Sequence, residues 1–287
     1  MKIELLLCII PAMLLAINTG CTLPTKAFQA DATSDRQQPA IVLVAFGTSP
    51  PNARKVFDYI DSRAKEHFPG HDIHWAFTSE IIRRKLKTQG IITQSLTEVV
   101  ASLRQAGIKR AVFQSLHVAP GQEFNEIKKV DTTGLTIAVG DALLATDADI
   151  EAAIKAVETN ISPDAPNILV AHGNEHHPEF NVQILKFAQK IEAIHSNTWV
   201  CSVEGQPGTE KLQKAAQPAA QKGEVNFIPL MIVAGDHIMN DVMGDEDDSW
   251  KNVVAAQKTN CAKPLGYNDE ILEIYFQHLE NALRKVL

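Results

Sequence analysis

Three side chains with metal-binding chemistry stand at the ends of apolar, strand-like runs: Glu123, His172 and His237. Two imidazoles and one carboxylate suit a divalent first-row metal such as cobalt or iron. Three protein ligands also leave coordination positions open, as a catalytic site requires and a structural site does not. A histidine at a strand end is more often a structural or solvated residue, so the hypothesis depends on whether the fold brings the three together.

Neighbouring polar residues carry weaker signals. His176 and His177 look like a metal-binding pair, but adjacent residues rarely point at one ion. We interpret them as loop residues or as residues that contact the metal ligands without binding the ion. The acidic run at 245–248 is usually a solvated loop, although its charge could attract cations toward a site. His117 stands within a strand, where a wall or core residue and a ligand-facing group both fit.

Other common chemistries lack their motifs. The sequence contains no GxxxxGK[ST] phosphate loop, no GxGxxG dinucleotide fingerprint and no GxSxG nucleophile elbow, so nothing in it indicates ATP. The formal net charge of -7 argues against nucleic acid as a partner, because phosphate binding needs clustered lysine and arginine. A metal ion or a small ligand fits the composition better.

The elements that must position the ligands alternate between strands and helices. Buried runs such as 40–47 and 167–173 are separated by amphipathic stretches such as 52–68, which predicts parallel sheets covered by helices on both faces. "VLVAFG" is echoed 126 residues later by "ILVAHG", and "FQSLHVAPG" is echoed 114 residues later by "FIPLMIVAG". Generic buried strands also produce short echoes. If these mark a repeat, the protein has two similar, doubly wound α/β lobes.

The repeat predicts how the candidate ligands of the two lobes correspond to each other. The 114-residue offset sets Glu123 of one lobe opposite His237 of the other, and the 126-residue offset pairs Phe46 with His172. Ligand sites of open α/β sheets lie at the carboxyl ends of the strands. We therefore expect a site between the two lobes, with ligands contributed by both.

The first residues predict export. An apolar run after Lys2 is too short to span a bilayer but suits the core of a signal peptide over residues 1–20. The stretch "NTGC" resembles the cleavage site of a bacterial lipoprotein, so a lipid anchor at Cys21 is a second expectation. The mature protein is expected in the periplasm.

The rest of the chain divides into three parts. Residues 21–38 are expected to form a polar tether, residues 39–145 an N-terminal α/β lobe and residues 146–287 a C-terminal α/β lobe. Cys201 and Cys261 remain in the exported part and could pair in an oxidising compartment, although sequence alone does not show that they are close.

Six stretches in order along the chain carry a resemblance to a known family: "AFGTS" (45–49), "AFTSEIIRRKL" (76–86), "QSLHVAPGQEF" (114–124), "AHGNEHH" (171–177), "PLMIVAGDHIMND" (229–241) and "DDSWK" (247–251). With them the sequence resembles the anaerobic sirohydrochlorin cobaltochelatases of cobalamin synthesis, within the class II chelatases, as an exported member. The resemblance implies a ferrochelatase-like fold, no ATP requirement, and metal binding by Glu123, His172 and His237. Phe124 stands where the family often has tyrosine, so a hydroxyl contact is lost.

The activity implied by this resemblance is insertion of Co²⁺ into the tetrapyrrole sirohydrochlorin, or of Fe²⁺ for sirohaem. A neutral histidine or the carboxylate would accept the pyrrole protons as the metal passes to the ring nitrogens. Arg83, Arg84 and Lys85 could meet the carboxylates of the substrate, or could be plain solvent-facing charges. The alternative function is an exported carrier of tetrapyrrole, haem or metal that keeps the pocket without turnover. The choice between cobalt and iron, and assembly into a homo-oligomer, stay open.

Overall fold

A computed structural model describes residues 38–287 of the chain. The predicted signal peptide, the candidate lipid anchor at Cys21 and all but the last residue of the predicted tether lie outside these residues. Within them the strands are β1 (Ala40–Ala45), β2 (Ile73–Phe77), β3 (Arg110–Ser115), β4 (Thr136–Gly140), β5 (Asn167–Gly173), β6 (Thr198–Glu204), β7 (Glu224–Pro229) and β8 (Lys258–Cys261).

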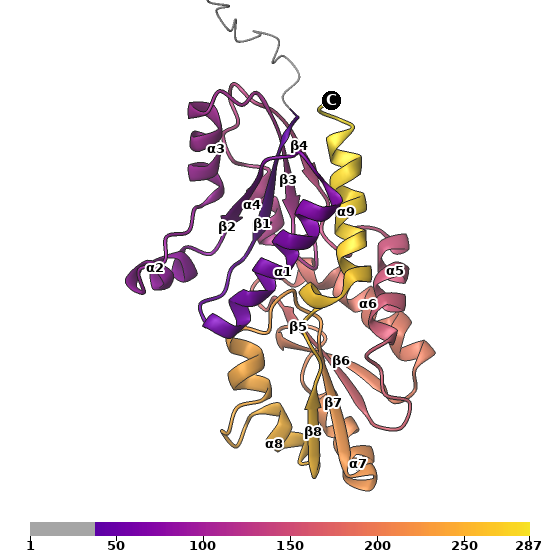
Figure 1. Cartoon of the computed structure of the whole chain (residues 1–287). Helices are drawn as coiled ribbons and strands as arrows, with labels where there is room; N and C mark the ends of the chain where they lie inside the picture. The colour runs from indigo at the N-terminus through magenta and orange to yellow at the C-terminus, as the bar shows by residue number, and fades with distance from the viewer. Residues whose placement is uncertain (1–37) are drawn as a thin grey trace, which may run out of the picture. The chain divides into compact units, whose positions relative to one another are not determined.

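The strands form two parallel sheets with the same internal order (Figure 1). The first sheet runs β2-β1-β3-β4 and the second runs β6-β5-β7-β8, and every neighbouring pair is parallel. Strand β7 begins 114 residues after the start of β3 and ends 114 residues after the end of β3. This spacing equals the offset of the sequence repeat. The predicted fold class, two similar doubly wound α/β lobes, is therefore confirmed.

Helices cover both faces of each sheet. Capping residues explain where several begin: Ser95 and Glu98 form a reciprocal capping box, as do Thr146 and Asp149, and Asn268 caps the last helix. The helices are α1 (Pro51–His67), α2 (Glu80–Thr88), α3 (Leu96–Gln105), α4 (Gln122–Ile127), α5 (Asp147–Glu158), α6 (Val182–Ile194), α7 (Lys211–Lys222), α8 (Trp250–Val254) and α9 (Asp269–Leu283), with 3-10 turns η1 (Pro178–Asn181) and η3 (Leu265–Tyr267) and the π-helical turn η2 (Ile238–Val242).

The central strands are buried on both faces because helices pack on each side. In β1, Leu43 faces a core shared by the two sheets, whereas Val44 faces a separate core with α3 and α4. In β5, Leu169 joins the shared core and Val170 packs in a third core with α7 and α8. Burial of such a side chain contributes about 1.5–3 kcal/mol, and Leu43→Ala should cost roughly 2–5 kcal/mol of stability. This framework fixes where the strand ends lie.

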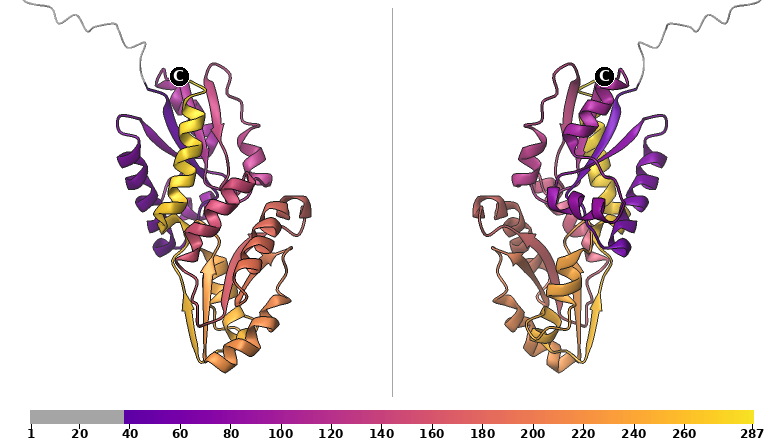
Figure 2. Two further views of the ribbon diagram at one scale, coloured as in Figure 1. Left: turned by 90° about the vertical axis from the view of Figure 1, so that its right-hand side faces the viewer. Right: turned by 90° about the vertical axis from the view of Figure 1, so that its left-hand side faces the viewer.

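The last helix corrects the predicted boundary between the lobes. The sequence interpretation assigned residues 146–287 to the second lobe, yet α9 packs on β3 and β4 of the first sheet (Figures 1 and 2). Tyr275 and Leu279 are buried there because that sheet face offers apolar surface, and the Tyr275 hydroxyl donates a hydrogen bond to the His117 carbonyl at 3.1 Å. The ranges 39–145 and 146–287 separate the two sheets but not the helices that cover them.

The disulfide considered for Cys201 and Cys261 does not form, since both thiols are free. Cys201 lies in β6 and Cys261 in β8, at opposite edges of the second sheet, with β5 and β7 between them. Adjacent strands are about 4.8 Å apart, so the two residues are separated by roughly 14 Å, well beyond the reach of a disulfide. Burial raises the pKa of the Cys201 thiol to about 12, so this thiol stays neutral.

Candidate metal centre

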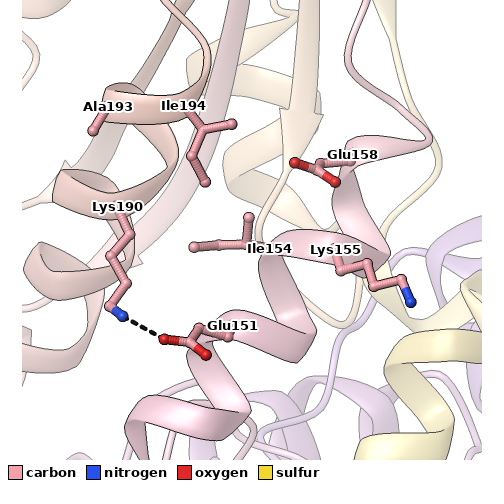
Figure 3. Close-up of a pocket in the computed structure, with 7 residues that line it drawn as sticks. All are labelled: Glu151, Ile154, Lys155, Glu158, Lys190, Ala193 and Ile194. Carbon is pink, nitrogen blue, oxygen red and sulfur yellow. Dashed lines mark hydrogen bonds and ion pairs between the residues drawn. The ribbon is translucent and has the colours of Figure 1, made fainter.

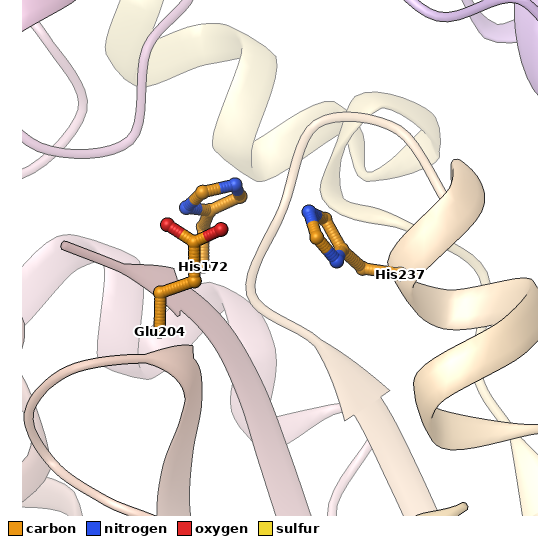
Figure 4. A group of neighbouring side chains, drawn as sticks. All are labelled: His172, Glu204 and His237. Carbon is orange, nitrogen blue, oxygen red and sulfur yellow. The ribbon is translucent and has the colours of Figure 1, made fainter. Parts of the chain in front are cut away.

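The second sheet brings two of the predicted ligands, His172 and His237, next to Glu204 (Figure 4). One ligand atom from each of the three side chains lies within 4.8 Å of the other two. The imidazole rings are 4.8 Å apart between centroids and nearly perpendicular, at 84°. Ligand atoms around one first-row ion are roughly 3–4 Å apart, since each bond is about 2.1 Å. Small side-chain rotations would let all three hold a single divalent cation.

Neighbouring strands place His172 and Glu204 together. His172 is the penultimate residue of β5, Glu204 is the last residue of β6, and Gly173 is in register with Glu204. Gly173 has a φ of +74°, and a Cβ at this position would lie 1.8 Å from the Glu204 carbonyl oxygen. Only glycine permits this approach of the two strand ends. Gly173 therefore allows the side chains beside it to meet.

His237 reaches the group through a loop. Strand β7 ends at Pro229, within the apolar stretch "FIPLMIVAG". The following residues form the connection to His237, which precedes the π-helical turn η2. Turns of this kind are rare and occur frequently at functional sites. Figure 4 shows the His237 ring pointing from this turn toward His172.

Hydrogen bonds at Nδ1 leave the Nε2 atoms of both histidines free for a ligand. His172 Nδ1 lies 2.8 Å from the Gly173 carbonyl oxygen, which can only accept, so Nδ1 donates. His237 Nδ1 lies 2.6 Å from Asp241 Oδ2, and an ionised carboxylate likewise only accepts. In a neutral imidazole the other nitrogen then keeps its lone pair. Both histidines are prepared to bind a cation through Nε2.

Loops of the first sheet lie against the same region. A Cβ on Gly235, two residues before His237, would lie 2.9 Å from Thr48 Oγ1 in the loop after β1. A Cβ on Gly121, after β3, would lie 3.8 Å from the Phe180 side chain. The carboxyl ends of strands from both sheets therefore approach each other, which is the usual place for a ligand site in α/β sheets.

Glu123 is not among the side chains whose ligand atoms lie within 4.8 Å of one another, and its role as a metal ligand stays a prediction. It lies half-buried in the first turn of the short helix α4, beside Phe124, which is buried in the core of the first lobe. The carboxylate beside the two histidines is that of Glu204. The repeat offset related Glu123 to His237 but carried no distance between the lobes. Glu204 ends the strand sequence "TWVCSVE", and this acidic residue at a strand end is the signal that sequence reasoning missed.

The exposed loop after β5 lies outside the group, as expected. His176 is largely exposed, with Nε2 3.6 Å from a Glu175 carboxylate oxygen. His177 Nδ1 lies 3.3 Å from Glu179. The acidic run at 245–248 is exposed, and neither it nor the two histidines contributes to the cluster of ligand atoms found among residues 38–287.

His117 is a half-buried imidazole just beyond the end of β3. Its Nδ1 lies 2.9 Å from Ser115 Oγ, and its Nε2 is buried without a hydrogen-bond partner among the described residues. Burial lowers the pKa of His117 to about 4, so the ring is neutral near pH 7. It does not belong to the ligand group.

A separate hollow of about 480 Å³ lies between α5 and α6 (Figure 3). Ile154 and Ile194 line it, and Lys190 forms an ion pair with Glu151 at 2.7 Å. None of the candidate metal ligands lines this hollow, so it has no part in the site.

Comparison with known proteins assigns the chain to a family. The model of the cobalt chelatase (CbiK) family matches residues 39–284. The sirohydrochlorin cobaltochelatase CbiKC of Nitratidesulfovibrio vulgaris is 28% identical over 256 residues, which cover 85% of this chain and 90% of that protein. The sirohydrochlorin cobaltochelatase of Salmonella typhimurium is 27% identical over 256 residues, which cover 85% of this chain and 96% of that protein.

Solved structures give the same fold. SirB from Bacillus subtilis with Fe³⁺ superposes with a TM-score of 0.61 at 11% identity, covering 86% of this chain and 96% of that one. CbiX, the terminal enzyme for siroheme biosynthesis in denitrifying bacteria, superposes with a TM-score of 0.54 at 14% identity, covering 85% and 99%. At these identities the likeness concerns the fold.

Proposed function

Because the chain belongs to the cobalt chelatase (CbiK) family, we propose that it inserts Co²⁺ into sirohydrochlorin and that His172, Glu204 and His237 hold the ion. The observation that carries this proposal is the ligand group itself, two imidazoles with free Nε2 atoms and one carboxylate within 4.8 Å. These ligand types suit Co²⁺ and also Fe²⁺. Three protein ligands leave coordination positions for the nitrogens of the macrocycle.

The reaction exchanges one divalent cation, which is a substrate here, for two pyrrole protons. The three side chains first bind the cation through lone pairs. As the macrocycle nitrogens take the ion, each protein ligand that releases it regains a lone pair and can accept a pyrrole proton. His172 is exposed to solvent, which gives the protons a route out of the site. No step needs a nucleotide, so the proposed reaction uses no ATP.

Of the three basic residues expected to meet the substrate carboxylates, two already form ion pairs with glutamates and the third is exposed to solvent. Arg83 Nη1 lies 3.8 Å from a Glu98 carboxylate oxygen, and Arg84 forms an ion pair with Glu80. Lys85 is exposed on the same helix. These ion pairs reduce what Arg83 and Arg84 can offer an anionic ligand, although the Nε of Arg83 is buried without a hydrogen-bond partner among residues 38–287.

Arg54 is a better candidate for a substrate carboxylate. It is half-buried in the first turn of α1, and its Nε is buried without a hydrogen-bond partner among residues 38–287. The turn follows directly from the loop of Thr48, which approaches Gly235 near the metal ligands. A guanidinium binds carboxylates with paired N–H donors. Arg54 therefore joins the proposal as a substrate-binding residue.

The proposal includes export of the enzyme. A signal peptide over residues 1–20 and a lipid on Cys21 would hold the catalytic lobes in the periplasm. Among residues 38–287, no helix is long and apolar enough to cross a bilayer. Intact-mass measurement of protein from the periplasm or membrane should show a chain that begins at Cys21, with an added lipid mass if this cysteine is acylated. A cytosolic chain that retains Met1 would contradict this part.

The test of the function is direct. Purified protein is mixed with sirohydrochlorin and Co²⁺ without ATP, and the absorbance change of metal insertion is followed against a protein-free control. Acceleration by catalytic amounts of protein supports the chelatase. Stoichiometric binding of the tetrapyrrole with no acceleration would instead support the alternative, a carrier that keeps the pocket without turnover.

A further inference from the structure

The two histidines of the metal centre are held by unlike partners. His172 Nδ1 donates to a neutral backbone carbonyl, that of Gly173, at 2.8 Å. His237 Nδ1 donates to the Asp241 carboxylate at 2.6 Å. A charged acceptor makes a shorter and stronger hydrogen bond than a neutral one. The two potential ligands are therefore unequal before any metal binds.

Asp241 lies in the π-helical turn η2, four residues after His237. The backbone hydrogen bonds of this turn include Met243 N to the Ile238 carbonyl oxygen, five residues back, at 3.0 Å. Within this turn the Asp241 carboxylate lies against the ring that points to the site. Among residues 38–287, no lysine or arginine forms an ion pair with Asp241, whose ion-pair partner is His237. Its negative charge is thus directed to the imidazole.

From this geometry we infer that Asp241 is a positioning residue that makes His237 the stronger of the two histidine ligands. The carboxylate fixes the ring with Nδ1 protonated, so that Nε2 keeps its lone pair on the metal side. It also increases the electron density that Nε2 offers to a cation. Because the Nδ1 of His172 donates to a neutral carbonyl instead of a carboxylate, the ion should leave His172 first and His237 last when it passes to the macrocycle. This inference rests on the proposed metal site.

The same turn offers a matched control. Asn240 Nδ2 donates to Asp236 Oδ1 at 3.0 Å, which is a second side-chain pair four residues apart in the same segment. Among residues 38–287, Asp236 forms no hydrogen bond or ion pair with a histidine, and its side chain is exposed like that of Asp241. Asp241→Asn and Asp236→Asn therefore remove one negative charge each from the same turn, but only the first removes it from a metal ligand.

The experiment measures Co²⁺ affinity of the mature protein without tetrapyrrole, by isothermal titration. Asp241→Asn should weaken binding about tenfold, and Asp236→Asn should change it less than twofold. In a His237→Ala background, Asp241→Asn should have no further effect. Wild-type affinity in Asp241→Asn, or an equal loss in both backgrounds, would overturn the inference.

Imidazole ¹⁵N shifts of the metal-free protein give a second readout. Asp241→Ala should move His237 from the single tautomer protonated at Nδ1 to a mixture of tautomers, while His172 keeps its signals. Unchanged His237 signals would overturn the inference. If the wild-type protein binds no Co²⁺ at all, the proposed metal site fails, and the ¹⁵N shifts still decide whether Asp241 orients His237.

Discussion

The two lobes have the same strand order but different chemistry at the ends of their strands. In the second lobe, β5, β6 and the connection after β7 carry His172, Glu204 and His237 within 4.8 Å of one another. In the first lobe, the position equivalent to His172 is Phe46, and Glu123 corresponds to His237. The first lobe thus keeps the framework of the second without its group of metal ligands.

The difference indicates a division of work between the lobes. Phe46 is 46% exposed and Ile81, at the start of α2, is 77% exposed, although both are large apolar side chains. Aromatic and aliphatic surface suits a planar macrocycle, whereas imidazole and carboxylate suit the ion. On the proposed function, the second lobe binds the metal and the first lobe offers contacts to the tetrapyrrole.

The largest expected effect comes from equivalent residues of the two lobes. His172→Ala and His237→Ala should each slow Co²⁺ insertion at least ~100-fold, because each removes a metal ligand and a proton acceptor. Phe46→Ala, at the position equivalent to His172, should slow the reaction less than about tenfold. Initial rates followed by absorbance, with circular dichroism to verify folding, provide the measurement.

The reverse pattern would break the comparison. If Phe46→Ala lost as much activity as His172→Ala while all variants kept their fold, the metal ligands of the second lobe would not make the larger contribution to the reaction.

A second contrast concerns stability at low pH. Burial holds the pKa of His117 at about 4, whereas an unfolded histidine titrates near 6.5, so between these values only the unfolded chain binds the proton. Stability is therefore lost as pH falls from about 6.5 toward 4, by about 2 kcal/mol at pH 5. His117→Met, which copies Met231 at the equivalent position of the second lobe, should lack this loss. Urea unfolding at pH 7 and pH 5 measures it, and an identical pH dependence in both proteins would contradict the assignment.

A smaller effect is expected for the substrate contact of the first lobe. Arg54→Gln should raise the KM for sirohydrochlorin about tenfold, since a charge-assisted hydrogen bond contributes about 1.5–3 kcal/mol. Co²⁺ affinity should not change, because Arg54 is not among the metal ligands. Arg84→Gln is the matched control, since Arg84 already pairs with Glu80. Equal KM values for wild type and Arg54→Gln would remove Arg54 from the substrate site.

Much of the fold could be predicted because its central strands are buried on both faces. β1 and β5 are continuous apolar runs, and their repeat gave the correct relation of the two sheets. The edge strands β2 and β8 were not predicted, because edge strands are only partly buried and "KTNC" carries no apolar pattern. The docking of α9 depends on which sheet face lacks a helix, and that is a property of the assembled fold.

The candidate site could be predicted only in part. His172 and His237 stood out because each interrupts or follows an apolar run just at a glycine, where a strand must end. The sequence proposed only Glu123 as the carboxylate ligand and did not single out Glu204, since a linear offset between repeats does not give a distance between lobes. Glu204 joins His172 because β6 pairs with β5 in register, and strand pairing was not part of the sequence argument.

The most direct test compares the carboxylate of each lobe. Glu204→Gln and Glu123→Gln both remove one negative charge and keep the side-chain shape, and Co²⁺ affinity is measured for each without tetrapyrrole. The structure predicts at least a tenfold loss for Glu204→Gln, as for removal of a group that directly ligates the ion, and a change of less than about twofold for Glu123→Gln. A large loss for Glu123→Gln with wild-type affinity in Glu204→Gln would contradict a metal centre built by the second lobe alone.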